Sequence, residues 1–191
     1  MSDITLGSAS PRRADLLRQI GLSFDILPSQ VVEDILPGED PASYCERAAL
    51  MKARDVAGRS SSRLIIGADT VVVLDGEILG KPGSEAEARS MLERLSGRTH
   101  QVITGVCVLE RTSGRHEVFS VTSSVAFRVI DPLEIDRYIG TGEPMDKAGA
   151  YAVQGIGAIF IRSMSGSYSN VVGLPLYETA QALDRFGVAV L

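Results

Sequence analysis

The stretch Ile4-Thr5-Leu6-Gly7-Ser8-Ala9-Ser10-Pro11-Arg12-Arg13 decides how the chain begins to fold. Its apolar start predicts a short strand at 4–6. Ser10 followed by Pro11 predicts the N-cap and the first position of a helix, because serine accepts from free N–H groups and proline has a helical φ. A strand, a tight turn and a helix in this order are typical of an α/β fold.

The helix start in this stretch favours an anion. Unpaired N–H groups and the positive end of the helix dipole gather there. Arg12 and Arg13 lie in the first turn, where the dipole disfavours positive charge, so a negative ligand is expected, and phosphate suits a guanidinium. The alternative is a capped helix with two solvated arginines, which would be preferred if this stretch stood alone.

Strand and helix patterns alternate along the rest of the chain and predict an α/β fold. We expect a twisted mixed β-sheet flanked by helices, with a cleft between two lobes, and a single domain spanning residues 1–191. The patterns predict strands at 24–27, 64–68, 71–74, 77–79, 101–111, 117–129 and 158–161, helices at 41–58, 84–95, 131–139 and 176–186, and loops at 140–157 and 165–175.

The composition excludes several classes of protein. A net charge of −5 argues against a nucleic-acid binder, which needs a broad basic surface. No apolar run reaches the roughly 18 residues of a membrane span, and no signal-peptide pattern is present. Cys45 and Cys107 form no metal-binding or redox motif and fit a reducing compartment, so a cytoplasmic protein is expected.

Asp69 is the strongest catalytic candidate. It follows the apolar run 64–68, and a carboxylate at a strand end that faces a cleft is well placed to bind a metal or activate water. An aspartate in an ordinary turn is the alternative. Glu33, Lys52 and Lys81 would each, taken singly, be solvated surface residues.

Taken together, the charged residues suggest a phosphate site. The chain has no G-x-S-x-G, Walker A or G-x-G-x-x-G motif, which weakens the serine hydrolase, P-loop and dinucleotide-binding alternatives. Cations hold phosphates, while carboxylates hold a divalent metal and activate water, the minimum set for metal-assisted cleavage of a phosphoanhydride. The candidates are the cations Arg12, Arg13, Lys52 and Lys81 and the carboxylates Glu33, Asp69 and Asp146.

Along nearly its whole length the chain resembles the Maf family of nucleoside triphosphate pyrophosphatases. The resemblance rests on motifs that occur in the family's order. They are Ser8-Ala9-Ser10-Pro11-Arg12-Arg13, Glu33, Lys52, Gly67-Ala68-Asp69-Thr70, Lys81-Pro82, Asp146-Lys147-Ala148-Gly149 with Tyr151 and Gln154-Gly155, and Asn170-Val171-Val172-Gly173-Leu174-Pro175.

The resemblance implies a two-lobed α/β fold like that of inosine triphosphate pyrophosphatases, with the nucleotide in a central cleft. It implies hydrolysis of dTTP and UTP between the α and β phosphates, with Mg²⁺ or Mn²⁺ as cofactor. Modified pyrimidine nucleotides and a homodimer are left open.

The resemblance also assigns roles to individual residues. Asp69 would be the proton acceptor and, with Glu33, a metal ligand. Arg12, Thr70 and Gln154 would mark the branch that acts on dTTP and UTP rather than on 7-methyl-GTP. The phosphate and metal site would be lined by Ser8, Arg13, Glu33, Lys52, Lys81 and Asp146.

Two other functions remain as alternatives. Members of this family are associated with inhibition of septum formation, so a nucleotide-binding regulator without turnover could use the same pocket. The intact acidic set argues against a pure binder. A house-cleaning pyrophosphatase for purine nucleotides of the ITP or XTP type is the other alternative.

Overall fold

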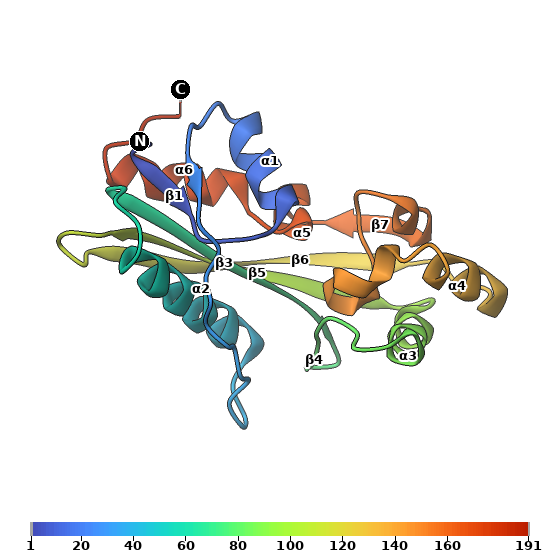
Figure 1. The fold of residues 1–191 in the computed structure, drawn as a ribbon. Coiled ribbons are helices and arrows are strands. Elements are labelled where there is room, and N and C mark those ends of the chain that lie inside the picture. The colour runs from blue at the N-terminus through green and yellow to red at the C-terminus, as the bar shows by residue number, and fades with distance from the viewer. Residues whose placement is uncertain (1, 191) are drawn as a thin grey trace. The chain divides into compact units, whose positions relative to one another are not determined.

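The computed structural model describes residues 2–190, which Figure 1 shows as a ribbon. The chain divides into two compact units, each built from separate stretches of sequence. Unit 1 consists of residues 1–69, 104–121 and 173–191, and unit 2 of residues 70–103 and 122–172. The expectations of a single domain over residues 1–191 and of a nucleotide cleft remain predictions.

A seven-stranded mixed sheet is the framework, in the order β2-β1-β3-β5-β6-β7 with β4 paired to β3. β1 is parallel to β2 and β3, whereas the β3–β4 and β6–β7 pairs are antiparallel. The predicted mixed sheet with flanking helices is thereby confirmed. The strands are β1 (Ile4–Leu6), β2 (Asp25–Ile26), β3 (Leu64–Leu74), β4 (Glu77–Leu79), β5 (Thr99–Glu110), β6 (His116–Phe127) and β7 (Ile161–Ser165).

Unit 1 contains the helices α1 (Pro11–Gln19), α2 (Pro41–Ala57) and α6 (Leu176–Arg185). α2 lies on one side of the strands, and α1 and α6 lie on the other (Figure 1). The Asp40 side chain caps α2 by accepting from the backbone N–H groups of Ala42 and Ser43, both at 3.1 Å. Such a cap satisfies donors that the helix itself leaves unpaired.

Two glycines bring α2 against the sheet of unit 1. A Cβ on Gly67 would lie 2.2 Å from the carbonyl oxygen of Ala49, and one on Gly105 would lie 2.2 Å from that of Cys45. Both contacts are with backbone atoms of α2, which cannot move away as the end of a flexible side chain could. The absence of side chains at these positions of β3 and β5 therefore sets how closely α2 approaches.

We expect Gly105→Ala to lower the free energy of unfolding by about 1–3 kcal/mol or more, since a methyl group there overpacks a tight contact. Urea unfolding followed by circular dichroism measures the change. Gly80→Ala is the matched control because a Cβ at Gly80 meets nothing within 4 Å. Equal stability of the two variants would contradict the close approach of α2.

Unit 2 contains α3 (Glu85–Leu95), α4 (Pro132–Ile139), α5 (Tyr168–Val172) and the 3₁₀ turns η1 (Glu143–Asp146), η2 (Ala148–Ala150) and η3 (Ile156–Phe160). Its core joins Val72 and Leu74 of β3 with Leu92 of α3 and Ile135 of α4. Aromatic rings add edge contacts, including Tyr138 with Phe160 at 5.1 Å between centroids.

Three local predictions were wrong. β3 is one strand through residues 64–74, so Asp69 lies inside a strand and not at its end. The polar residues at 69–70 predict an end to the first strand, but the backbone stays extended through them. The predicted strand 158–161 is mostly η3, because pairing with β6 starts only at Ile161. The predicted loop 165–175 contains α5.

No helix within residues 2–190 has the length and apolar character needed to cross a membrane.

Candidate active site

The turn between β1 and α1 fixes Arg13. The Ser8 hydroxyl, which is buried, accepts from Arg13 Nη1 at 3.0 Å and from the Ser10 backbone N–H at 3.2 Å. Arg13 Nε donates to the carbonyl oxygen of Gly173 at 2.7 Å. These contacts hold the guanidinium inside unit 1, although Ser10 caps α1 by position and not by a side-chain bond.

Arg13 interacts electrostatically with two of the predicted carboxylates, Asp69 and Glu33. Burial lowers the pKa of Arg13, the negative charge of Asp69 acts in the opposite direction, and the neighbouring Arg12 lowers the pKa again. Glu33 also favours the charged guanidinium. A cation that is partly desolvated and lies near another cation gains from an anionic ligand, so an anion at Arg13 stays a prediction.

Glu33, Lys52 and Asp69 meet in unit 1. Lys52 Nζ lies 2.9 Å from Glu33 Oε1 and 2.7 Å from Asp69 Oδ1, and it donates to the carbonyl oxygen of Ala68 at 3.4 Å. The side chains of Lys52 and Asp69 are each 12% exposed and that of Glu33 is 24% exposed. The three residues come from α2, β3 and the segment before α2, and we call them the acid–lysine cluster.

The cluster has an excess of negative charge. The pKa of Glu33 is raised, chiefly by burial; Lys52 lowers it, and the charge and hydrogen bonding of Asp69 raise it. Burial and the charges of Asp69 and Glu33 also raise the pKa of the Tyr44 phenol, which therefore stays neutral beside them. Within the cluster one ammonium faces two carboxylates, and Arg13 adds a second positive charge near Asp69 and Glu33.

The donors of the cluster suit a magnesium-type ion. Within residues 2–190 no group of three or more His, Cys, Asp or Glu side chains could hold a metal. Mg²⁺ is commonly bound through one or two carboxylates, with water and substrate phosphate oxygens as its other ligands. Glu33 and Asp69 fit that pattern.

Unit 2 carries the other predicted residues. Thr70 follows Asp69 in β3 and is half-buried. Lys81 is exposed, and its loop is tied to η2 by a bond of 3.0 Å from the Gly149 N–H to the Gly80 carbonyl. Asp146 is exposed, and its carboxylate accepts from the ammonium group of Lys147.

Gln154 lies on a separate exposed stretch between η2 and η3. The structure thus brings together Ser8 with Arg13, and Glu33 with Lys52 and Asp69. It brings the Lys81 loop to the segment that follows Asp146. The predicted site residues fall in both units.

Sequence reasoning missed two features of unit 2. The first is the carboxylate of Glu143, which accepts from backbone N–H groups of Ile156 and Gly157, shortly after Gln154. The only sequence signal for it is the Gly-Glu-Pro turn at residues 142–144. The second is buried His100, whose Nε2 lies 2.8 Å from the Tyr151 hydroxyl. Burial lowers the pKa of His100 to about 4, so it is neutral.

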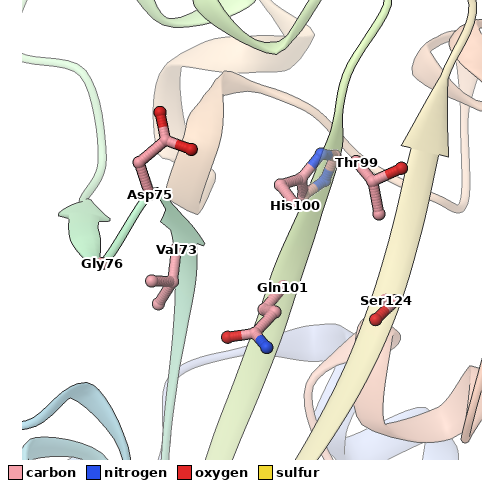
Figure 2. Close-up of a pocket in the computed structure, with 7 residues that line it drawn as sticks. All are labelled: Val73, Asp75, Gly76, Thr99, His100, Gln101 and Ser124. Atoms are coloured by element: carbon pink, nitrogen blue, oxygen red, sulfur yellow. The ribbon is translucent and has the colours of Figure 1, made fainter.

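Figure 2 shows a pocket of about 330 Å³ in unit 2. The predicted site residues do not line it, and its carboxylate, Asp75, already accepts from Arg98 Nη2 at 2.6 Å. We assign it no ligand. Its lining residues are Val73, Asp75, Gly76, Thr99, His100, Gln101 and Ser124.

Comparisons with known proteins agree on one family. A dTTP/UTP pyrophosphatase of Syntrophotalea carbinolica is 50% identical over 100% of this chain and 87% of its own. One of Pelotomaculum thermopropionicum is 50% identical over 100% of both chains, and one of Anaeromyxobacter dehalogenans is 51% identical over 96% of this chain and 94% of its own. The model of the family described as Maf-like protein matches residues 3–186, and the chain therefore belongs to the Maf family.

Proposed function

We propose that this chain hydrolyses dTTP and UTP between the α and β phosphates and releases the nucleoside monophosphate and pyrophosphate. The observation that carries the proposal is the acid–lysine cluster, in which Lys52 Nζ lies within 2.9 Å of both Glu33 and Asp69. The names of the relatives, which are about half identical to this chain over nearly its whole length, support the choice of substrate.

Asp69 is the proposed proton acceptor. A water oxygen bonds to the α phosphorus, the bond from that phosphorus to the oxygen bridging the α and β phosphates breaks, and the water proton passes to the Asp69 carboxylate. Lys52 Nζ fixes the position of that carboxylate through the 2.7 Å contact. Pyrophosphate leaves with the electrons of the broken bond.

Glu33 and Asp69 are the residues that would hold Mg²⁺ or Mn²⁺. The ion, when bound, supplies positive charge that polarises the phosphoryl group and offsets the charge of the leaving pyrophosphate. Arg13, positioned by Ser8 and Gly173, would bind phosphate oxygens through its planar fork. Lys81 and Asp146, which lie in unit 2, are also proposed to bind phosphate or metal.

Arg12, Thr70 and Gln154 are the proposed determinants of base preference. They bring a guanidinium, a hydroxyl and an amide, all of which can pair with the edge of uracil or thymine. We further propose that the enzyme acts in the cytoplasm, since its two cysteines, Cys45 and Cys107, form no metal-binding or redox motif and suit a reducing compartment.

The test is the identity of the product. We expect one pyrophosphate per UTP consumed, no orthophosphate, loss of activity in excess chelator and recovery with Mg²⁺ or Mn²⁺. Ion chromatography separates the two products. Orthophosphate release, or full activity with chelator, would overturn the mechanism.

The same assay separates the other functions. A regulator without turnover would bind UTP, as measured by calorimetry, without releasing pyrophosphate. A purine house-cleaning enzyme would cleave ITP or XTP faster than UTP or dTTP.

A further inference from the structure

The carboxylate of Glu143 in unit 2 accepts hydrogen bonds from a phenol and two backbone N–H groups. Its Oε1 accepts from the Tyr138 hydroxyl at 2.9 Å and from the Gly157 backbone N–H at 3.0 Å, and its Oε2 accepts from the Ile156 N–H at 2.9 Å. Burial alone would raise the pKa of Glu143, but these bonds, together with the positive charge of Lys147, outweigh it, and the pKa is lowered. The group is therefore an ionised acceptor that binds backbone.

Tyr138 extends this contact to the other side of Gln154. Its hydroxyl oxygen accepts from the Ala152 backbone N–H at 3.3 Å while it donates to Glu143. Ala152 comes two residues before Gln154, and Ile156 comes two residues after it. The phenol and the carboxylate thus form hydrogen bonds at both ends of the segment 152–157.

The segment is also shaped to fit these two side chains. A Cβ on Gly155 would lie 2.6 Å from Glu143 Oε2, and one on Gly157 would lie 2.6 Å from the Tyr138 hydroxyl. Gly155 has a φ of +147°, a conformation that residues with a Cβ rarely adopt. The backbone beside Gln154 therefore rests directly on the carboxylate.

We infer that Glu143, supported by Tyr138, is a positioning residue that fixes the backbone on both sides of Gln154 and so sets the preference for uracil and thymine. The inference rests on the proposed function, in which the exposed Gln154 amide reads the base. An amide distinguishes donor from acceptor only if its orientation is fixed, because rotation about its side chain exchanges the two. By accepting from the Ile156 and Gly157 N–H groups, Glu143 holds the backbone from which this side chain extends and so limits the positions that the amide can reach.

A purely structural role for Glu143 would have a different consequence. It would lower stability and reduce kcat/KM for all nucleotides by the same factor. A positioning role changes the ratio of kcat/KM between UTP and CTP, because only the correct base gains from an oriented Gln154.

The experiment compares Glu143→Ala, Glu143→Gln and the control Glu77→Gln. Glu77 is also a carboxylate of unit 2 that accepts hydrogen bonds, here from Arg94, but it lies on β4. We expect Glu143→Ala to reduce the UTP-to-CTP ratio of kcat/KM by about tenfold or more, chiefly through a higher KM for UTP. Glu143→Gln keeps one oxygen acceptor and should fall between wild type and Glu143→Ala, while Glu77→Gln should keep the wild-type ratio.

A double-mutant cycle with Gln154→Ala tests whether Glu143 acts through Gln154. If it does, adding Glu143→Ala to Gln154→Ala changes the ratio little further, since the effects are not additive. Additive losses, or an unchanged ratio in folded Glu143→Ala and Glu143→Gln proteins, would overturn the inference. If Glu143→Ala does not fold, Glu143→Gln and Tyr138→Phe carry the same comparison.

A second measurement keeps this inference separate from the proposed function. If the wild-type enzyme releases no pyrophosphate from UTP or dTTP, the proposed function fails. Amide hydrogen exchange of Ile156 and Gly157 then tests the positioning alone: faster exchange in Glu143→Gln supports it, and unchanged exchange contradicts it.

Discussion

Asp69→Asn is expected to reduce turnover of UTP by about 10²–10⁴-fold, the contribution typical of a general base, while the chain stays folded. Asparagine has nearly the size of aspartate but cannot take a proton from water at neutral pH. Its Oδ1 can still accept from Lys52 Nζ, which lies 2.7 Å from Asp69 Oδ1 in the wild-type chain. Glu33 Oε1 lies 2.9 Å from the same Nζ, so the ammonium of Lys52 keeps a carboxylate partner in the variant.

The measurement is kcat for UTP, with circular dichroism on the same samples. Asp55→Asn is the matched control, because Asp55 is another unit 1 aspartate in an ion pair, with Arg59 Nη2 at 2.6 Å. We expect Asp55→Asn to leave kcat unchanged. Near-normal turnover by a folded Asp69→Asn protein would exclude Asp69 both as proton acceptor and as metal ligand.

Local signals in the sequence were enough to predict much of the fold. Asp75 and Gly76 take positive φ values of 54° and 82° in the turn between β3 and β4, as an Asp-Gly hairpin requires. Asp40 and Pro41 begin α2, and Ser84 caps α3 by accepting from the Glu87 N–H at 3.2 Å. In each case neighbouring residues suffice, so no tertiary information is needed.

Tertiary packing decided what the sequence could not show. The convergence of Glu33 and Asp69 on Lys52 depends on how closely α2 lies against β3 and β5, which Gly67 and Gly105 control. No spacing pattern encodes that approach. The resemblance supplied the residues of the cluster, and the structure supplied their distances.

Glu143 was missed for a different reason. Its partners are two backbone N–H groups and one phenol, and a pattern search for side chains with shared chemistry does not detect backbone donors. The same holds for η3, where apolar residues predicted a strand but the glycines at 155 and 157 allow tight turns against Glu143 and Tyr138.

UTP and dTTP are expected to be turned over with similar kcat/KM, whereas CTP, the standard purine triphosphates and 7-methyl-GTP are expected to be poor substrates, by about 10²-fold or more. The Gln154 amide offers one donor and one acceptor, which match O4 and N3–H of uracil and thymine. In cytosine the donor and the acceptor exchange places on that edge. When the wrong base binds, a polar group of the site is left without a hydrogen-bond partner. This costs more binding free energy than the loss of a methyl contact would.

Similar rates for UTP and dTTP follow if the site has room for the thymine methyl group. The measurement is kcat/KM for UTP, dTTP, CTP, GTP and 7-methyl-GTP, with Gln181→Ala as the control for Gln154→Ala, since Gln181 is an exposed glutamine on α6. Gln154→Ala should bring the UTP and CTP values together, and Gln181→Ala should not. A preference for GTP or 7-methyl-GTP would overturn the assignment to the pyrimidine branch while leaving pyrophosphate release intact, because the acid–lysine cluster is proposed to act on phosphates that all these substrates share.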